Sequence, residues 1–191
     1  MGIYTLRREQ FVTRPLEEVF GFFSDARNLQ KITPGWLNFQ ILTPGEIEIG
    51  PGTLLDYRLK WHGVPIRWRT QIVTWNPPRA FTDMQIRGPY PLWHHTHTFR
   101  AEAGGTRVVD AVKYRLPLGV LGAMAHRLGV RRDLERVFDY REQVIASLFP
   151  VIALARGGEG GDHNTDRRPH LTRRYNWGVR RFPGDSRGAP P

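Results

Sequence analysis

The chain has 191 residues, enough for one domain with a sizeable core, and its apolar (40%) and charged (24%) fractions are those of a soluble globular protein. It contains no cysteine, which excludes disulfides, thiol chemistry and cysteine-based zinc sites. No apolar run approaches the roughly 20 residues that span a bilayer, and the N-terminus lacks the apolar region of a signal peptide, so we expect a cytoplasmic protein.

The formal net charge of +10 suggests an anionic partner, but its distribution weakens that interpretation. Residues 155–191 hold eight arginines against four acidic residues, and the other arginines are spread over many predicted elements. The predicted folded part is therefore only moderately basic.

Residues 3–13 predict a strand with Tyr4, Leu6 and Phe11 as candidate inward groups. Pro15, followed by two glutamates, is typical of a helix N-terminus, and a short apolar helix is expected from there to Asp25. A second short helix over 26–32 should end where the sequence Thr-Pro-Gly breaks it.

Six strand-like runs follow, each separated from the next by glycine- or proline-containing turns: 39–43, 53–60, 66–75, 80–86, 92–102 and 106–116. Their short, near-regular spacing predicts one antiparallel meander. Alternation along 66–75 directs Trp68 inward, with Arg67 and Arg69 on the solvated face.

After Pro117 the apolar spacing changes to three and four residues, which predicts a long amphipathic helix over 118–149 with an interruption near Gly129. The rest of the chain is rich in glycine, proline and arginine without apolar periodicity. We therefore expect a ligand-binding domain over residues 1–154 and a disordered tail over 155–191.

These elements predict an α+β fold in which an antiparallel sheet of about seven strands curls around the C-terminal helix. A large antiparallel sheet twists, and its apolar concave face has to be covered. The C-terminal helix is the only predicted element long enough to cover it. Space for a ligand is expected between the helix and the sheet.

Several motifs in this order are similar to a known family. They are residues 11–25, Asn28-Leu29, Thr33-Pro34, residues 75–81 and 88–90, the strand with Trp93, His95, His97 and Phe99, Gly105-Thr106, Asp110, Tyr114 and Pro117. Together, over about residues 3–150, they resemble the helix-grip fold of the START-like, birch-allergen-like superfamily called SRPBCC. Within it, the chain resembles the bacterial ligand-binding and polyketide cyclase/dehydrase-like branch. The resemblance implies an internal cavity for a hydrophobic small molecule.

The strands 92–102 and 106–116 should form a hairpin that places His97 close to Asp110. Two registers are open: one faces His97 with Asp110 and Trp93 with Tyr114, and the other faces Asp110 with Phe99. In either register the imidazole and the carboxylate are within reach of each other. The pair has two interpretations: an acid–base dyad, or a structural pair that makes a buried aspartate tolerable.

His95 and His97 share a strand face with a spacing that suits a metal, and Asp110 is the one evident third ligand. No further ligand pattern is present, so we expect neither a metal nor another cofactor. We expect His97, Asp110 and Tyr114 as catalytic candidates. The predicted ligand-binding residues are Trp68, Phe81, Trp93, His95, His97, Phe99 and Tyr114.

The sequence has no phosphate-binding loop, nucleophile elbow or dinucleotide fingerprint. We therefore expect a protein that binds a lipid-, polyketide- or isoprenoid-like molecule as a carrier, sensor or sequestering protein. One alternative is a cyclase/dehydratase-type enzyme that uses the His97–Asp110 pair, with His97 or Tyr114 as acid or base. Another is binding of nucleic acid or an anionic membrane through the arginine-rich tail.

Overall fold

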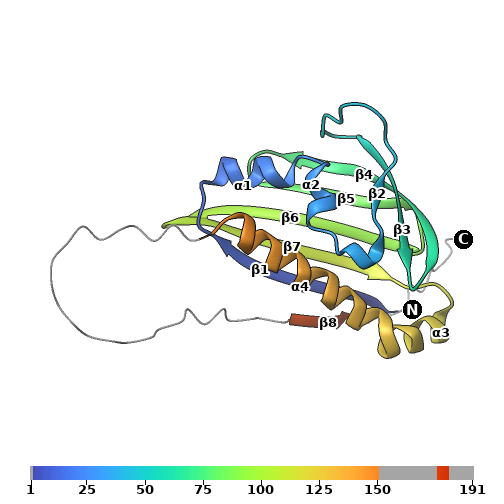
Figure 1. The fold of residues 1–191 in the computed structure, drawn as a ribbon. Coiled ribbons are helices and arrows are strands. Elements are labelled where there is room, and N and C mark those ends of the chain that lie inside the picture. Colours follow the sequence, from blue (N-terminus) through green and yellow to red (C-terminus); the bar gives the residue numbers. More distant parts are fainter. Residues whose placement is uncertain (1, 151–175, 181–191) are drawn as a thin grey trace, which may run out of the picture.

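The computed structural model describes residues 2–150 and 176–180, and it contains one antiparallel sheet (Figure 1). The strand order is β2-β3-β4-β5-β6-β7-β1-β8. The bounds are β1 Ile3–Val12, β2 Gln40–Ile41, β3 Leu54–Trp61, β4 Val64–Asn76, β5 Ala80–Arg87, β6 Leu92–Glu102, β7 Gly105–Arg115 and β8 Asn176–Arg180. The predicted meander of six strands, β2 to β7, is confirmed. β1 pairs with β7 and so adds a further strand at that side of the sheet.

Two short helices, α1 Leu16–Phe23 and α2 Asn28–Lys31, follow β1, and a 3₁₀ turn, η1 Gly35–Leu37, leads to β2. The predicted C-terminal helix is present in three consecutive parts: α3 Gly119–Ala125, a π-helical turn η2 His126–Val130, and α4 Arg131–Leu148. The interruption expected near Gly129 thus takes the form of a π turn. Figure 1 shows α4 running along β7 and β1, as the helix-grip arrangement requires.

The core forms where α1 and α4 pack on the sheet. Alternation along β1 buries Leu6 (1% exposed) and Val12 (3% exposed) on the concave side. The prediction that Phe11 faces inward is wrong, because Phe11 has the opposite parity from Leu6. Its ring is 37% exposed and lies 5.3 Å beneath the guanidinium of Arg107 on the outer face.

Two polar side chains on the inward face of β1 contact α4. Arg8 Nη2 lies 3.4 Å from Asp139 Oδ1, and Gln10 Nε2 donates a hydrogen bond of 3.0 Å to the carbonyl oxygen of Glu142. These contacts fix the helix along the strand. The space between sheet and helix is therefore bounded by charged groups on the β1 side.

The tail expected to be disordered lies mostly outside the described residues, and so does most of the surface suggested for nucleic acid or anionic membranes. The exception is 176–180, which forms β8 and pairs antiparallel with β1, Leu6 opposite Trp177. The disorder expected for the tail stays a prediction. Among the described helices, none is long and apolar enough to cross a membrane.

The start of β7 passes so close to β1 that it requires glycine. A Cβ atom on Gly105 would overlap the carbonyl oxygen of Val12 and approach the Phe11 ring to 2.9 Å. We expect Gly105→Ala to lower the free energy of unfolding by about 1–3 kcal/mol in urea denaturation. The matched control is Gly21→Ala in α1, where nothing lies within 4 Å. That variant should be no less stable than the wild type, and equal stability of the two variants would contradict the close approach.

Candidate functional site

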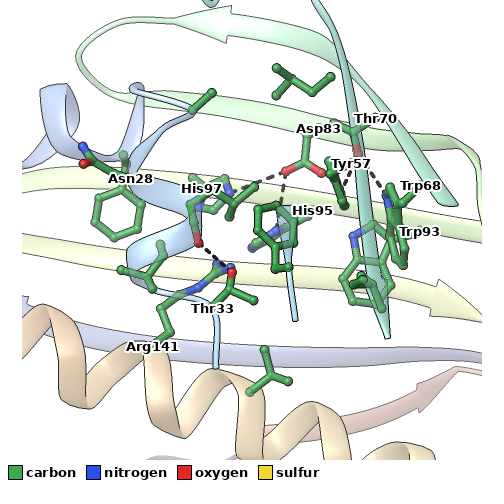
Figure 2. A pocket seen from close by; sticks show the side chains of 18 of the residues that line it. Asn28, Thr33, Tyr57, Trp68, Thr70, Asp83, Trp93, His95, His97 and Arg141 are labelled. Atoms are coloured by element: carbon green, nitrogen blue, oxygen red, sulfur yellow. Dashed lines mark hydrogen bonds and ion pairs between the residues drawn. The ribbon is translucent and has the colours of Figure 1, made fainter. Parts of the chain in front are cut away.

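A cavity of about 160 Å³ lies between the concave face of the sheet and the helices (Figure 2). Its walls come from α1, α2, strands β3 to β6 and α4, and most of its lining is apolar. Five of the residues predicted to bind a ligand line it: Trp68, Phe81, Trp93, His95 and His97. Alternation on β4 and β6 accounts for Trp68, Trp93, His95 and His97, because residues two apart on a strand share a face, and Phe81 lies on β5.

Phe99 and Tyr114 were predicted to bind the ligand but are not among the lining residues. Phe99 is 2% exposed and packs its ring against Phe20 and Phe23. The hydroxyl of Tyr114 lies 2.8 Å from Nε2 of His126, in the π turn, and burial raises the pKa of this phenol. Both side chains have the contacts of core residues.

The hairpin of β6 and β7 adopts the first of the two predicted registers, with His97 opposite Asp110 and Trp93 opposite Tyr114. His97 Nδ1 lies 2.6 Å from Asp110 Oδ1, although the ring N–H is not aligned for a hydrogen bond. His95 Nε2 lies 3.2 Å from the same oxygen, within hydrogen-bond distance. Asp110 therefore contacts both imidazoles, and it lies behind them, outside the lining of the main cavity.

Asp83 completes the group on the other side of β6, and it was not predicted. It lies on β5 opposite His95, and its Oδ2 is 3.5 Å from His95 Nδ1 and 3.5 Å from His97 Nε2 (Figure 2). The two imidazoles thus lie between two carboxylates, one of which, Asp83, faces the cavity. A signal was present, because Asp83 shares a strand face with Phe81, a predicted lining residue.

Burial and neighbouring charges shift the pKa values of His95, His97 and Asp110. Burial disfavours the His97 imidazolium, but the carboxylates of Asp110 and Asp83 outweigh burial and raise the pKa of His97. Burial and the neighbouring His97 charge lower the pKa of His95. Burial disfavours the Asp110 carboxylate, but both histidines favour it and hold the pKa of Asp110 well below its usual value. One proton is therefore held more tightly by His97 than by His95.

Asp83, His95 and His97 could also hold a divalent metal ion, because one ligand atom of each lies within 4.8 Å of the others. Two imidazole nitrogens and one carboxylate oxygen are a donor set that zinc accepts, and Asp110 would orient both rings from behind. The carboxylate on the cavity side is thus Asp83, whereas the sequence suggested Asp110. That no metal binds stays a prediction.

A second polar group lies further along the cavity wall. The Tyr57 hydroxyl is 3.3 Å from Thr70 Oγ1, and Trp68 Nε1 donates a hydrogen bond of 3.2 Å to the same oxygen. Burial raises the pKa of Tyr57, so its phenol is neutral at physiological pH. The cavity therefore has two polar regions within its aromatic walls. One consists of neutral hydroxyls and an indole, and the other of the titratable groups around His97.

A match to the family described as "Polyketide cyclase / dehydrase and lipid transport" spans residues 12–139, about two thirds of the chain. The chain belongs to this family. Membership confirms the resemblance to the SRPBCC superfamily. No curated protein sequence matches the chain.

Solved structures confirm the helix-grip fold of this family member. Protein TTHA0849 from Thermus thermophilus is 19% identical, with a TM-score of 0.59, over 75% of this chain and 98% of that one. Major latex-like protein 151 from Panax ginseng is 10% identical, with a TM-score of 0.58, over 78% and 99%. Ara h 8.0201 is 16% identical, with a TM-score of 0.53, over 76% and 99%. At these identities the similarity concerns the fold alone.

The environment of Asp110 predicts a strong effect of neutralising it. We expect Asp110→Asn to cost about 3 kcal/mol of unfolding free energy at about pH 6, below the raised pKa of His97, because the buried imidazolium loses its counter-charge. The pKa of Asp110 is lowered in the folded protein. The wild type is therefore more stable than the variant above the ordinary aspartate pKa of 3.8, and this difference in unfolding free energy disappears as the pH falls through the lowered pKa. Urea denaturation as a function of pH measures this difference.

Asp56→Asn is the matched control, because Asp56 pairs with Arg69 at 2.7 Å on the outer, partly exposed face of the sheet. Exposed ion pairs contribute little, so this variant should stay close to the wild type. If the two variants lose the same stability, the buried cluster does not depend on the charge of Asp110.

Proposed function

We propose that the protein binds a hydrophobic small molecule, of lipid, polyketide or isoprenoid type, and acts as a carrier, sensor or sequestering protein. The family and the fold support hydrophobic ligand binding in general. The observation that carries the proposal for this chain is the cavity itself, about 160 Å³ of space with predominantly apolar walls. Pockets of this composition gain affinity from apolar contact and orientation from a few polar groups.

The size of the cavity limits what fits entirely inside. A cavity of roughly 150 Å³ with an apolar lining holds a molecule the size of benzene. A compact ring system therefore fits the described space, and a longer chain has to extend towards solvent or displace side chains. The indoles of Trp68 and Trp93, 5.2 Å apart at 89°, provide flat surfaces for such a ring.

Native mass spectrometry of the purified protein tests ligand binding. We expect a co-purified apolar compound, and we expect Val137→Trp to abolish it, because Val137 lines the cavity and an indole there would fill the space. The control is Val73→Trp, at a 37% exposed position outside the lining, which should retain the compound. Absence of any apolar compound in the wild type across several preparations would contradict the proposal.

A second candidate function, an acid–base enzyme of the cyclase/dehydratase type, is favoured by one specific observation. An enzyme needs its acid–base group at the edge of the cavity, whereas a carrier does not, and His97 lines the cavity between Asp83 and Asp110. The imidazole could exchange a proton with a bound carbonyl compound while Asp110 orients the ring.

His97→Gln separates the two candidates in the same experiment. An enzyme without its acid–base group should accumulate its substrate, so the compound bound to the variant would differ from that in the wild type by the mass lost or gained in the reaction, such as one water. A carrier should hold the same compound in both forms. Circular dichroism verifies that the variant is folded.

A further inference from the structure

We propose that the preferred ligand carries an acid group, a carboxylate or a similar anion, that binds the guanidinium of Arg141. This inference rests on the proposed binding function and specifies the chemical class of the ligand. It concerns a residue on the helix side of the cavity, opposite the sheet residues suggested by the sequence.

Arg141 projects from α4 towards the cavity in Figure 2, and it lines the cavity wall. Arg141 is one of the buried charged residues of the described chain, with only 9% of its surface exposed. Its Nε is fully buried and has no hydrogen-bond partner, and among the side chains of residues 2–150 the guanidinium has no ion-pair partner. Its guanidinium carbon lies over the ring of Phe138, 5.0 Å from the ring centroid.

The acidic groups around Arg141 already have partners. Asp110, which borders a small space of about 10 Å³ together with Arg141, contacts His95 and His97. Asp139 contacts Arg8, and Asp83 lies 3.5 Å from both imidazoles. No carboxylate of the described chain therefore lies within ion-pair distance of Arg141.

An arginine stays charged in a protein, so a buried guanidinium without a counter-ion is costly. An anion in the cavity would remove this cost, and the planar fork of N–H donors matches a carboxylate especially well. The rest of the lining is apolar, so the complementary ligand has an apolar body with an acidic end. Arg141 would bind the acid, and the aromatic walls would contact the body.

The direct test compares benzoic acid with benzamide by isothermal titration calorimetry on the full chain. The two probes have nearly the same size and shape and differ in charge at neutral pH. We expect the acid to bind about 10- to 100-fold more tightly, the range that a charge-assisted hydrogen bond contributes. If the amide binds as tightly as the acid, the inference is overturned and the proposed binding function stands. If neither binds, the proposed function itself fails for compact ring systems, and the inference falls with it.

Variants locate the effect on Arg141. Arg141→Gln should lose the preference for the acid and still bind the amide, and Arg141→Lys should keep part of the preference. Arg67→Gln, at an exposed position on β4 outside the cavity lining, should behave as the wild type. Thermal melting without ligand adds a second readout, because removing an uncompensated buried charge should not lower stability. A preference for the acid that survives in Arg141→Gln would overturn the inference.

An independent observation concerns the outer surface of α3 and η2. Five large apolar side chains, each more than half exposed, gather on this short segment: Leu118, Val120, Leu121, Met124 and Leu128. We call them the α3 patch. Single exposed apolar residues are normal, but a group of them within one short segment, residues 118–128, marks an interaction site.

We infer that the α3 patch docks on an anionic membrane surface, and the charges around it support this occupant. Between Asp110 and Asp133 the sequence holds no acidic residue, and it holds five basic ones, of which Arg127, Arg131 and Arg132 are exposed beside the patch. Apolar side chains next to arginines are the composition of interfacial helices, which insert shallowly while the cations contact acidic headgroups.

Co-sedimentation with vesicles tests this surface. We expect the full chain to bind vesicles of phosphatidylcholine with phosphatidylserine and to bind pure phosphatidylcholine weakly. The double variant Leu121→Gln/Leu128→Gln should bind the mixed vesicles about tenfold more weakly, since each buried leucine contributes binding free energy. The control is Val64→Gln, an exposed apolar position on β4 (61%) outside the patch. Unchanged binding in the double variant overturns the inference. So does a dimer, seen by light scattering, that the double variant abolishes, because a second copy would then be the occupant.

Discussion

The register between β6 and β7 determines the chemistry of the concave face. With His97 opposite Asp110, the same alternation turns Trp93, His95 and His97 towards the helix side. A slip by one residue would exchange the two faces of the strand and place the imidazoles in solvent. It would also leave Asp110 without its partners, and a buried carboxylate is tolerated only when it is compensated. The core and the polar group in it therefore depend on the same strand pairing.

Charged groups form a row that crosses the sheet and continues onto the helix. Asp83 on β5, the histidines on β6 and Asp110 on β7 follow one another, and Arg8 on β1 lies opposite Asp110 and reaches Asp139 on α4. Arg141 lies on the same helix, two residues beyond Asp139. One side of the cavity is thus polar, and the aromatic residues of β3, β4 and β6 form the other. A molecule inside would be oriented by this difference before any specific contact is considered.

Much of this arrangement could be predicted from the sequence, and the limits have physical reasons. The bounds of β6 and the inward direction of Trp68 follow from alternation alone. The choice between two hairpin registers did not follow, because Gly104 suits a turn at Ala103-Gly104 as well as one at Gly104-Gly105. Asp83 was missed because β5 and β6 are joined by a longer, proline-containing loop, from which no cross-strand partner can be counted. Arg141 lies on a helix, where the depth of a side chain depends on how the helix packs on the sheet, and periodicity does not reveal this.

The pairing of β8 with β1 has a consequence for the edge of the sheet. Without residues 176–180, β1 would be the last strand, and the backbone N–H and C=O groups that Ile3–Arg7 direct towards β8 would be unpaired. Open edges of this kind join to strands of other molecules. Residues 176–180 therefore protect this edge of the sheet. A shortened chain that ends after α4 would expose the edge, and copies of the protein could then pair through it.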